Sequence, residues 1–354
     1  MKDTEFINWL KREELFFLVE KYYPQFKKIF SDCMKVVKEH VLIILDLGYP
    51  TRRCAAVLAG CYLLAAKRLN LTYKLVVQDP KYTGQQAHPE VIEALLNHPS
   101  GNIICLALSG KLGSMKHIGK SFRTYIANNK HRFVSTPGLR DLETKYFSKL
   151  ASSIDVDYAQ MRVRGQELKK KVDFAETCQI MTDKGTNLTV DIHGKRAISN
   201  DGEYSNRGGN MPSGEVYFAP RGKRVEGVIV IDGTLKHNEG TIIVKEPIKL
   251  KISNGEIIDI QGGEEARILE KTFIEVEKRA QYPWGIKRVG EIGIGINPGA
   301  SLIPLTIVSE KAENTAHVGI GSNTWFGGTI YAISHFDEVF KNPRVYLDNK
   351  KINY

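Results

Sequence analysis

Two histidines and three acidic residues in the second half of the chain could together bind metal ions: Glu215, Glu291, His317, His335 and Asp337. Imidazole nitrogens and carboxylate oxygens suit borderline divalent cations such as Zn, Mn, Co or Fe(II), whereas Ca prefers cages made of oxygen atoms. His335 and Asp337 are two positions apart, so both side chains point to one face if their segment is a strand. Five ligands exceed the needs of one tetrahedral site. They would suit two cations about 3.5–4 Å apart that share a bridging carboxylate.

The setting of these residues supports the prediction of a metal site. A single Glu in a loop is usually solvated, and a single His lies more often on the surface or in the core than at a metal. Here each residue lies beside Gly, Pro or Asn at the end of an apolar run. Loops carried by a rigid sheet place functional groups at such points. The group as a whole, rather than any one member, therefore predicts the site.

The segments around these residues resemble the M29 family of metallo-aminopeptidases, which includes aminopeptidases T and S. The resemblance covers roughly residues 170–350, whereas residues 1–170 match only in general architecture. Four segments carry it, in the order of the family: residues 210–216 are similar to the motif N-x-P-x-G-E-V, residues 290–295 to the second Glu segment, Glu310-Lys311 with residues 317–321 to E-K…H-x-A-x-G, and Gly327-Gly328 with residues 335–337 to the final H-x-D.

The resemblance implies a function and a set of partners. All five residues would bind metal, with two divalent ions per chain (Zn, Co or Mn). The chain would be a metal-dependent, aminopeptidase-like hydrolase that releases N-terminal residues from short peptides, and it would form a homodimer. A bound dication lowers the pKa of its water and polarises the scissile carbonyl, and Glu215 or Glu291 would accept the proton as general base.

One position departs from the family pattern. M29 peptidases carry a catalytic Tyr seven residues after the His of the third segment, and Thr324 occupies that position here. A Thr hydroxyl has a shorter reach than a phenol and a very different pKa. The chain is also similar to compact M29-like proteins that are not peptidases, among them 2,5-dihydroxypyridine dioxygenases, which hold Fe(II) on two His and one Asp. His317, His335 and Asp337 could supply such a triad. A non-catalytic peptide-binding member of the fold is the third alternative.

Two further residues are candidates for substrate binding. Arg207 lies three residues before the Asn210 motif and could anchor a substrate carboxylate. Trp325 follows the His317 segment and could form a wall of the site, although an aromatic residue there could equally fill the core.

Composition limits the classes of protein. The chain has 354 residues, of which 42% are hydrophobic and 25% charged, as in ordinary globular proteins. It has no apolar run of 18 residues, and its first residues are too polar for a signal peptide, so we expect no membrane association. Five cysteines without metal or disulfide spacing fit a reduced, cytoplasmic protein. The net charge of +10 comes from dispersed lysines, which argues against nucleic-acid binding.

The elements that must carry the site follow from hydrophobic patterning. In residues 1–170, apolar strands alternate with helices, which predicts an N-terminal α/β domain with an open parallel sheet flanked by helices. Its expected strands are 41–47, 73–80, 102–110 and 131–138, and its helices include 3–40 with a break at Pro24, 51–66 capped by Thr51, 87–97 and a helix near 118–129.

Residues 171–354 show a different pattern. Short strands separated by Gly, Asn and Asp turns predict an α+β domain with a largely antiparallel sheet that carries the metal site. A helix is expected at 263–279, and strands are expected at 288–296, 316–321 and 330–334.

Overall fold

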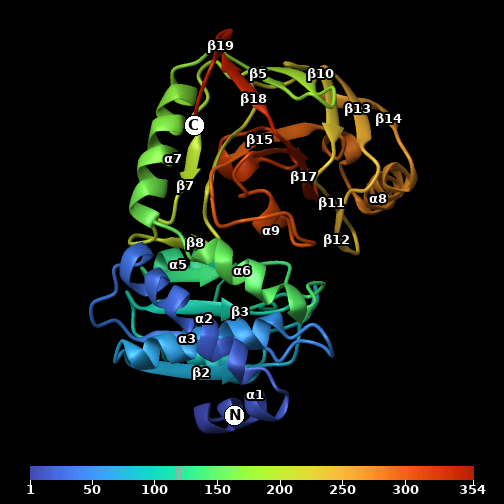
Figure 1. Ribbon diagram of the computed structural model, residues 1–354. Helices are drawn as coiled ribbons and strands as arrows, with labels where there is room; N and C mark the ends of the chain where they lie inside the picture. The colour runs from blue at the N-terminus through green and yellow to red at the C-terminus, as the bar shows by residue number, and fades with distance from the viewer. Residues whose placement is uncertain (116–117, 120) are drawn as a thin grey trace. The chain divides into compact units, whose positions relative to one another are not determined.

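The computed structural model describes residues 1–115, 118–119 and 121–354. Contacts divide the chain into two compact units, each formed by two segments of the chain (Figure 1). The first unit contains Met1–Tyr158 and Gly202–Pro212, and the second contains Ala159–Asp201 and Ser213–Tyr354. The expected fold class is confirmed, because a parallel sheet with flanking helices forms the first unit and antiparallel sheets form the second.

The sheet of the first unit has the order β2-β1-β3-β4-β8, and its neighbouring strands are parallel. Parallel strands covered on both faces read as continuous apolar runs, and β1 is buried along its whole length. The strands are β1 (Val41–Leu45), β2 (Tyr73–Val77), β3 (Ile103–Ala107), β4 (Arg132–Ser135) and β8 (Gly208–Asn210).

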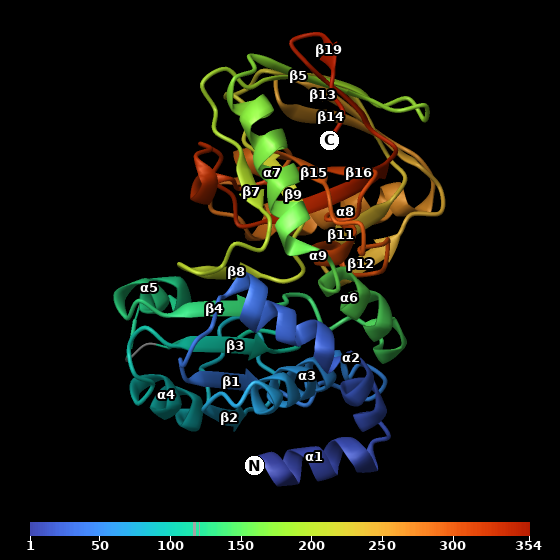
Figure 2. The same ribbon diagram turned by 60° about the vertical axis from the view of Figure 1, so that its left-hand side comes forward.

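Helices cover both faces of this sheet (Figure 2). Leu42 and Ile44 of β1 belong to one buried cluster with residues of α4 (Pro89–Leu96) and α5 (Phe122–Asn128). The helix α3 (Cys54–Arg68) packs against β1 and β3 and against α2 (Phe16–Lys28). The remaining helical segments of the unit are α1 (Asp3–Arg12), η1 (Ile29–Cys33), η2 (Thr144–Tyr146) and α6 (Phe147–Ile154).

The structure corrects several expected boundaries in this unit. Pro24 lies inside α2 and does not break it. Thr51 does not cap α3, because it has a φ of 62° in the left-handed region and the helix begins at Cys54. The helix expected near 118–129 is found as α5, and Lys120 within the expected range lies outside the described residues.

The second unit contains two antiparallel sheets (Figures 1 and 2). One has the order β14-β13-β10-β6-β5-β18-β19, with strands β5 (Thr177–Met181), β6 (Asn187–Asp191), β10 (Val225–Ile231), β13 (Ile248–Ser253), β14 (Glu256–Gln261), β18 (Arg344–Leu347) and β19 (Lys350–Lys351).

The other sheet, which we call the site sheet, has the order β12-β11-β17-β16-β15-β9-β7. Its strands are β7 (Ile198–Asn200), β9 (Glu215–Phe218), β11 (Thr234–His237), β12 (Gly240–Ile243), β15 (Val289–Gly295), β16 (Thr315–Gly321) and β17 (His335–Lys341). The helical segments of this unit are α7 (Tyr158–Asp173), α8 (Glu264–Arg279), η3 (Pro283–Gly285), α9 (Thr306–Ser309) and η4 (Thr324–Phe326). Among the described residues, no helix is both long and apolar enough to cross a membrane.

Alternation along β15 and β16 separates a core face from a polar face. Ile292, Ile294, Val318 and Ile320 are fully buried, as expected for side chains that point into a core. The residues that alternate with them, which include Glu291 and His317, point to the opposite face of the sheet. The strand expected at 330–334 is wrong: this segment is a loop, and the strand β17 begins at His335.

Candidate metal centre

The pairing of four neighbouring strands brings the five predicted ligands together. The strand β16 lies between β15 and β17, and its His317 is opposite Gly293 of β15. Asp337 of β17 is opposite Gly319, and Glu215 of β9 is opposite Gly295 of β15. Residues two apart share a face of a sheet, so these strands present Glu215, Glu291, His317, His335 and Asp337 on one surface.

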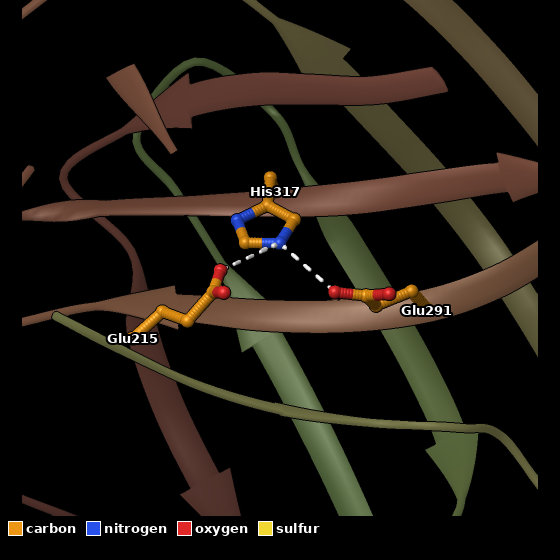
Figure 3. A group of neighbouring side chains, drawn as sticks. All are labelled: Glu215, Glu291 and His317. Atoms are coloured by element: carbon orange, nitrogen blue, oxygen red, sulfur yellow. Dashed lines mark hydrogen bonds and ion pairs between the residues drawn. The ribbon is translucent and has the colours of Figure 1, made fainter. Parts of the chain in front are cut away.

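The five side chains form two clusters that share Glu291. In the first, His317 Nε2 lies 3.6 Å from Glu215 Oε2 and 3.4 Å from Glu291 Oε1. Figure 3 shows the His317 ring between these two carboxylates. In the second, His335 Nε2 lies 3.4 Å from Glu291 Oε2 and 2.9 Å from Asp337 Oδ1. The Glu291 carboxylate therefore contacts both imidazoles: Oε1 lies near His317 and Oε2 lies near His335.

Glycines form the floor between the ligands. A Cβ on Gly319 would lie 2.6 Å from both Glu291 Cβ and His335 Cε1, and a Cβ on Gly293 would overlap the His317 ring. Both positions follow the period of two along their strands, so ligand and glycine share one face. The absence of side chains there leaves the room that the ligand side chains occupy.

The segment before β9 is held so that Glu215 enters the site sheet in register. Gly214 has a φ of 122°, and a Cβ on it would meet the Asn297 side chain. Its carbonyl accepts a hydrogen bond of 2.9 Å from Ile296 N, and the Asn297 amide donates to Ser213 O at 2.6 Å. These contacts tie the Glu215 segment to the end of β15.

The orientation of His335 is typical of a metal ligand. Its Nδ1 lies 2.8 Å from the carbonyl oxygen of Ser322, so Nδ1 carries a hydrogen that it donates. This bond directs Nε2 to the oxygens of Asp337 and Glu291. Metal-binding histidines are usually oriented in this way by a backbone carbonyl or carboxylate on the other nitrogen.

A buried lysine supports the first cluster. The Lys311 side chain is 2% exposed, and its ammonium group contacts Glu215 Oε1 and lies 2.5 Å from Glu310 Oε1. A buried cation without partners would be very costly, and Glu215 is the main counter-ion of Lys311, because burial raises the pKa of Glu310 to about 8. Although burial opposes it, Glu215 and Glu310 raise the pKa of Lys311 above its usual range.

The two imidazoles lie in a strongly acidic surrounding. Burial works against protonation of His317, yet its contact with Glu291 and nearby carboxylates raise the pKa of its ring to about 9. His335 has the same opposing burial, and Asp337 and Glu291 raise its pKa to about 10. Burial raises the pKa of Glu291, whereas for Asp337 the opposing effect of His335 and His317 prevails and lowers the pKa. The site therefore attracts positive charge at both imidazoles.

A divalent cation fits this donor set. Each cluster offers one imidazole nitrogen and two carboxylate oxygens whose ligand atoms lie within 4.8 Å of one another. Glu215 Oε2 is buried and has no hydrogen-bond partner, so it is free to bind a cation. Nitrogen and oxygen donors of this kind suit Zn, Mn, Co and Fe(II).

The structure groups the ligands differently from the triad considered from the sequence. His335 and Asp337 cluster with Glu291, while His317 clusters with Glu215 and Glu291. Within the described residues, no three-ligand cluster unites His317 with both His335 and Asp337.

The other candidate residues lie in different settings. Trp325 is beside the second cluster, with its ring centroid 4.8 Å from that of His335. Thr324 is exposed at the position of the M29 tyrosine. Arg207 is an exposed residue of the first unit, and its role in substrate binding stays a prediction, as does the choice of Glu215 or Glu291 as general base.

Sequence reasoning assigned no role to several residues that shape the centre. Lys311 and Glu310 were noted only as part of a family segment. Gly293 and Gly319 were also missed, although strands that alternate Ile or Val with Gly, Glu or His already signal a face that must stay open. The buried amide of Asn323, which organises the loop before β17, carries no comparable signal in the sequence.

The site and its strands define a class: an M29-like fold whose second unit carries a candidate metal centre. Residues 156–353, which include all five ligands, match a family described as 2,5-dihydroxypyridine 5,6-dioxygenase. The chain belongs to that family, named NicX.

Solved structures agree on the fold. A 2,5-dihydroxypyridine dioxygenase from Pseudomonas putida superposes with a TM-score of 0.67 at 17% identity, covering 93% of this chain and 95% of that one. AmpT from Thermus thermophilus superposes with a TM-score of 0.58 at 15% identity, covering 95% of each chain. No curated protein matches the sequence. The expected M29-like fold is thus supported, while the aminopeptidase identity is not.

Proposed function

We propose that this protein is an Fe(II)-dependent dioxygenase that opens the ring of a dihydroxylated pyridine or a closely related hydroxylated aromatic compound. The observation that supports it most is the match of residues 156–353 to the 2,5-dihydroxypyridine 5,6-dioxygenase family. The exposed Thr324 also supports it, because a peptidase of the M29 type would need a phenol at that position.

In this proposal the iron is held by the second cluster, formed by His335, Asp337 and Glu291. Open positions beside these donors would leave room for substrate and O2, although the usual Fe(II) site of this kind has two histidines and one carboxylate where this cluster has one histidine and two carboxylates. Bound iron would supply the chemistry that brings O2 and the ring together, and both oxygen atoms would enter the product as one ring carbon–carbon bond breaks.

The chain itself orients the donors. The Ser322 carbonyl fixes the His335 ring, and His317 holds the other oxygen of Glu291 at 3.4 Å. Lys311 balances the charge of Glu215 at the buried end of the centre. These contacts fix the ligand side chains before any substrate is bound, which lowers the cost of reaching the reactive geometry.

A second candidate function is a hydrolase of the aminopeptidase type. It is favoured by one observation, namely that the two clusters share Glu291 as a bridging carboxylate would in a site with two metal ions. It would require Zn, Co or Mn at both clusters and an attacking water.

One experiment separates the two functions. Metal-free protein is loaded with Fe(II) under anaerobic conditions, mixed with 2,5-dihydroxypyridine and O2, and followed by O2 uptake and by loss of the ring absorbance. Parallel samples loaded with Zn, Co or Mn are tested on a panel of dipeptides for release of amino acids. We expect uptake of O2 with iron alone, abolished in Asp337→Asn. Release of amino acids without O2 uptake would instead support the hydrolase.

A further inference from the structure

Two of the five candidate ligands are more exposed than the other three. The side chains of His335 and Asp337 are 19% and 18% exposed, whereas His317 is fully buried and Glu215 and Glu291 are each 7% exposed. Among the described residues, the candidate ligands most accessible to a substrate are therefore those of β17.

Trp325 lies beside His335. Its ring is 4.8 Å from the His335 ring, at an angle of 75° between the planes, and 5.1 Å from the Phe326 ring. The residue is nevertheless 49% exposed, which is a large fraction for an apolar side chain. About half of the Trp325 surface is thus exposed beside the most accessible candidate ligands.

The loop that carries Trp325 is fixed in place by a buried amide. Asn323 is 2% exposed, and its Nδ2 donates to Gly290 O at 2.8 Å while its Oδ1 accepts from Ile330 N at 2.8 Å. The Asn323 side chain fills the space that a Cβ on Gly328 would need. Since Gly290 precedes Glu291, Asn323 joins the Trp325 loop to the strand of a ligand. The backbone beside Trp325 is therefore fixed by hydrogen bonds to neighbouring segments.

The chemistry of this loop favours a planar partner. Residues 322–334 contain no charged side chain. The carboxylates that could receive the amino terminus of a peptide belong to the cluster, and the loop adds none to them. An exposed indole instead offers a π-surface that prefers offset-stacked or edge-to-face contact with another ring.

We propose that Trp325 is a specificity-determining residue, which holds the planar ring of an aromatic substrate against the most accessible ligands of the His335–Asp337–Glu291 cluster, and that Asn323 is the positioning residue for it. The choice of hydroxylated pyridines as substrates rests on the proposed function. The contact of a ring with Trp325 does not, and it applies to any planar aromatic ligand of this centre.

The test measures ring binding without turnover. Iron-loaded protein is titrated with 2,5-dihydroxypyridine under anaerobic conditions, in the parent protein and in the variants Trp325→Ala, Trp325→Phe and Tyr331→Ala. Tyr331 is the matched control, because it is an exposed aromatic residue of the same loop whose ring contacts Tyr282. We expect Trp325→Ala to weaken binding about tenfold or more, because ring stacking is lost. Trp325→Phe should stay within about threefold of the parent, since it keeps a ring. Tyr331→Ala should leave binding unchanged.

Iron content and steady-state kinetics complete the test. Iron content should equal that of the parent in every variant, and under turnover the loss in Trp325→Ala should appear in KM more than in kcat. Unchanged binding by Trp325→Ala would overturn the proposal. So would loss of iron from both Trp325 variants, because Trp325 would then serve only to support His335.

Failure of the proposed function would look different. If the parent protein consumes no O2 with 2,5-dihydroxypyridine, the same titration is repeated with catechol and with 2,5-dihydroxybenzoate. Binding of these compounds that depends on Trp325 would support the contact between Trp325 and an aromatic ring, although the proposed reaction would be wrong. If none of these compounds binds, the contact with Trp325 would be wrong as well.

Discussion

The most unusual residue of the centre is a cation. Lys311 is buried against Glu215 and Glu310, so removing it would take from both groups their contact with a buried cation. We predict that Lys311→Met lowers the free energy of unfolding of the metal-free protein by about 3–5 kcal/mol, the usual cost of breaking a buried ion pair.

Urea denaturation of the metal-free protein measures this effect, and Lys341→Met is the control. Lys341 forms a 3.5 Å pair with Asp232, but its side chain is 43% exposed, so its loss should cost within about 1 kcal/mol. Equal stability losses in both variants would contradict a special role of Lys311.

Protonation of the two histidines gives a prediction about pH. A metal ion needs the lone pair of each imidazole, whereas a pKa of about 9 for His317 and about 10 for His335 means that both rings hold a proton at pH 7 in the metal-free protein. Metal binding must then release protons, and affinity should rise as the pH increases from about 6 to 9.

Isothermal titration in buffers with different ionisation enthalpies would count the released protons. We expect release of at least one proton per metal ion at pH 7, from His335. The same shifts stabilise the metal-free fold below the pKa of an unfolded His near 6.5, and that stabilisation is lost as the pH rises through about 9 to 10. A metal affinity that does not change with pH would argue against protonation of His317 and His335 in the metal-free protein.

At the scale of single elements, β15 and β16 depend on glycine. A Cβ on Gly319 would collide with Glu291 and His335, while the backbone of Gly319 lies in an ordinary strand that Ala can adopt. We predict that Gly319→Ala folds but binds metal at least about tenfold more weakly, because the ligands are pushed apart. Equilibrium dialysis with Zn or Co measures this, with Gly119→Ala as the control, since the nearest atom to its added Cβ would be 3.6 Å away. Unchanged metal affinity in Gly319→Ala would contradict the role of glycine in the floor of the site.

The sequence predicted which side chains come together better than it predicted how they group. His335 and Asp337 could be placed on one face of a strand, because the period of two is local. The partition into two clusters depends on the register of β9, β15, β16 and β17, which brings together segments from 215 to 337. Register is set by burial and turn geometry across the sheet, and no local pattern reveals it. For the same reason the triad of His317, His335 and Asp337 seemed plausible from composition and is not the cluster observed.

The order of strands and helices could likewise be predicted from the sequence, whereas the boundaries of several elements could not. β1 and β3 were predicted from continuous apolar runs, and α8 was predicted within one residue of its observed start. Residues 330–334 are apolar enough to suggest a strand, yet they form a loop in which Ile330 is hydrogen-bonded to Asn323 and Ser334 to Ser322. Tertiary contacts thus accompany a departure from the local propensity, as is common for strands.

At the scale of the whole molecule, the chain returns once to a unit that it has left. Residues 202–212 belong to the first unit, where β8 pairs with β4, although the segments on both sides of them belong to the second. Pairing of strands so far apart in sequence has no signature in hydrophobic periodicity. The Asn210 motif therefore begins in one unit, and its candidate metal ligand Glu215 lies in the other.

This division leads to a prediction about metal removal. All five ligands belong to the second unit, and a ligand that binds only the native state stabilises the elements that hold it. Chelation should therefore speed amide hydrogen exchange in β9, β15, β16 and β17 and in residues 322–334, while exchange in β1 and β3 stays unchanged.

Hydrogen-exchange mass spectrometry of the metal-loaded and chelated protein tests this directly. Asp337→Asn treated in the same way is the control, because weakened metal binding should already give it the exchange pattern of the chelated parent. Faster exchange in β1 and β3 after chelation would show that the metal also stabilises the first unit. Unchanged exchange throughout would mean that these five side chains do not hold a stabilising ion, and it would count against both metal-dependent functions.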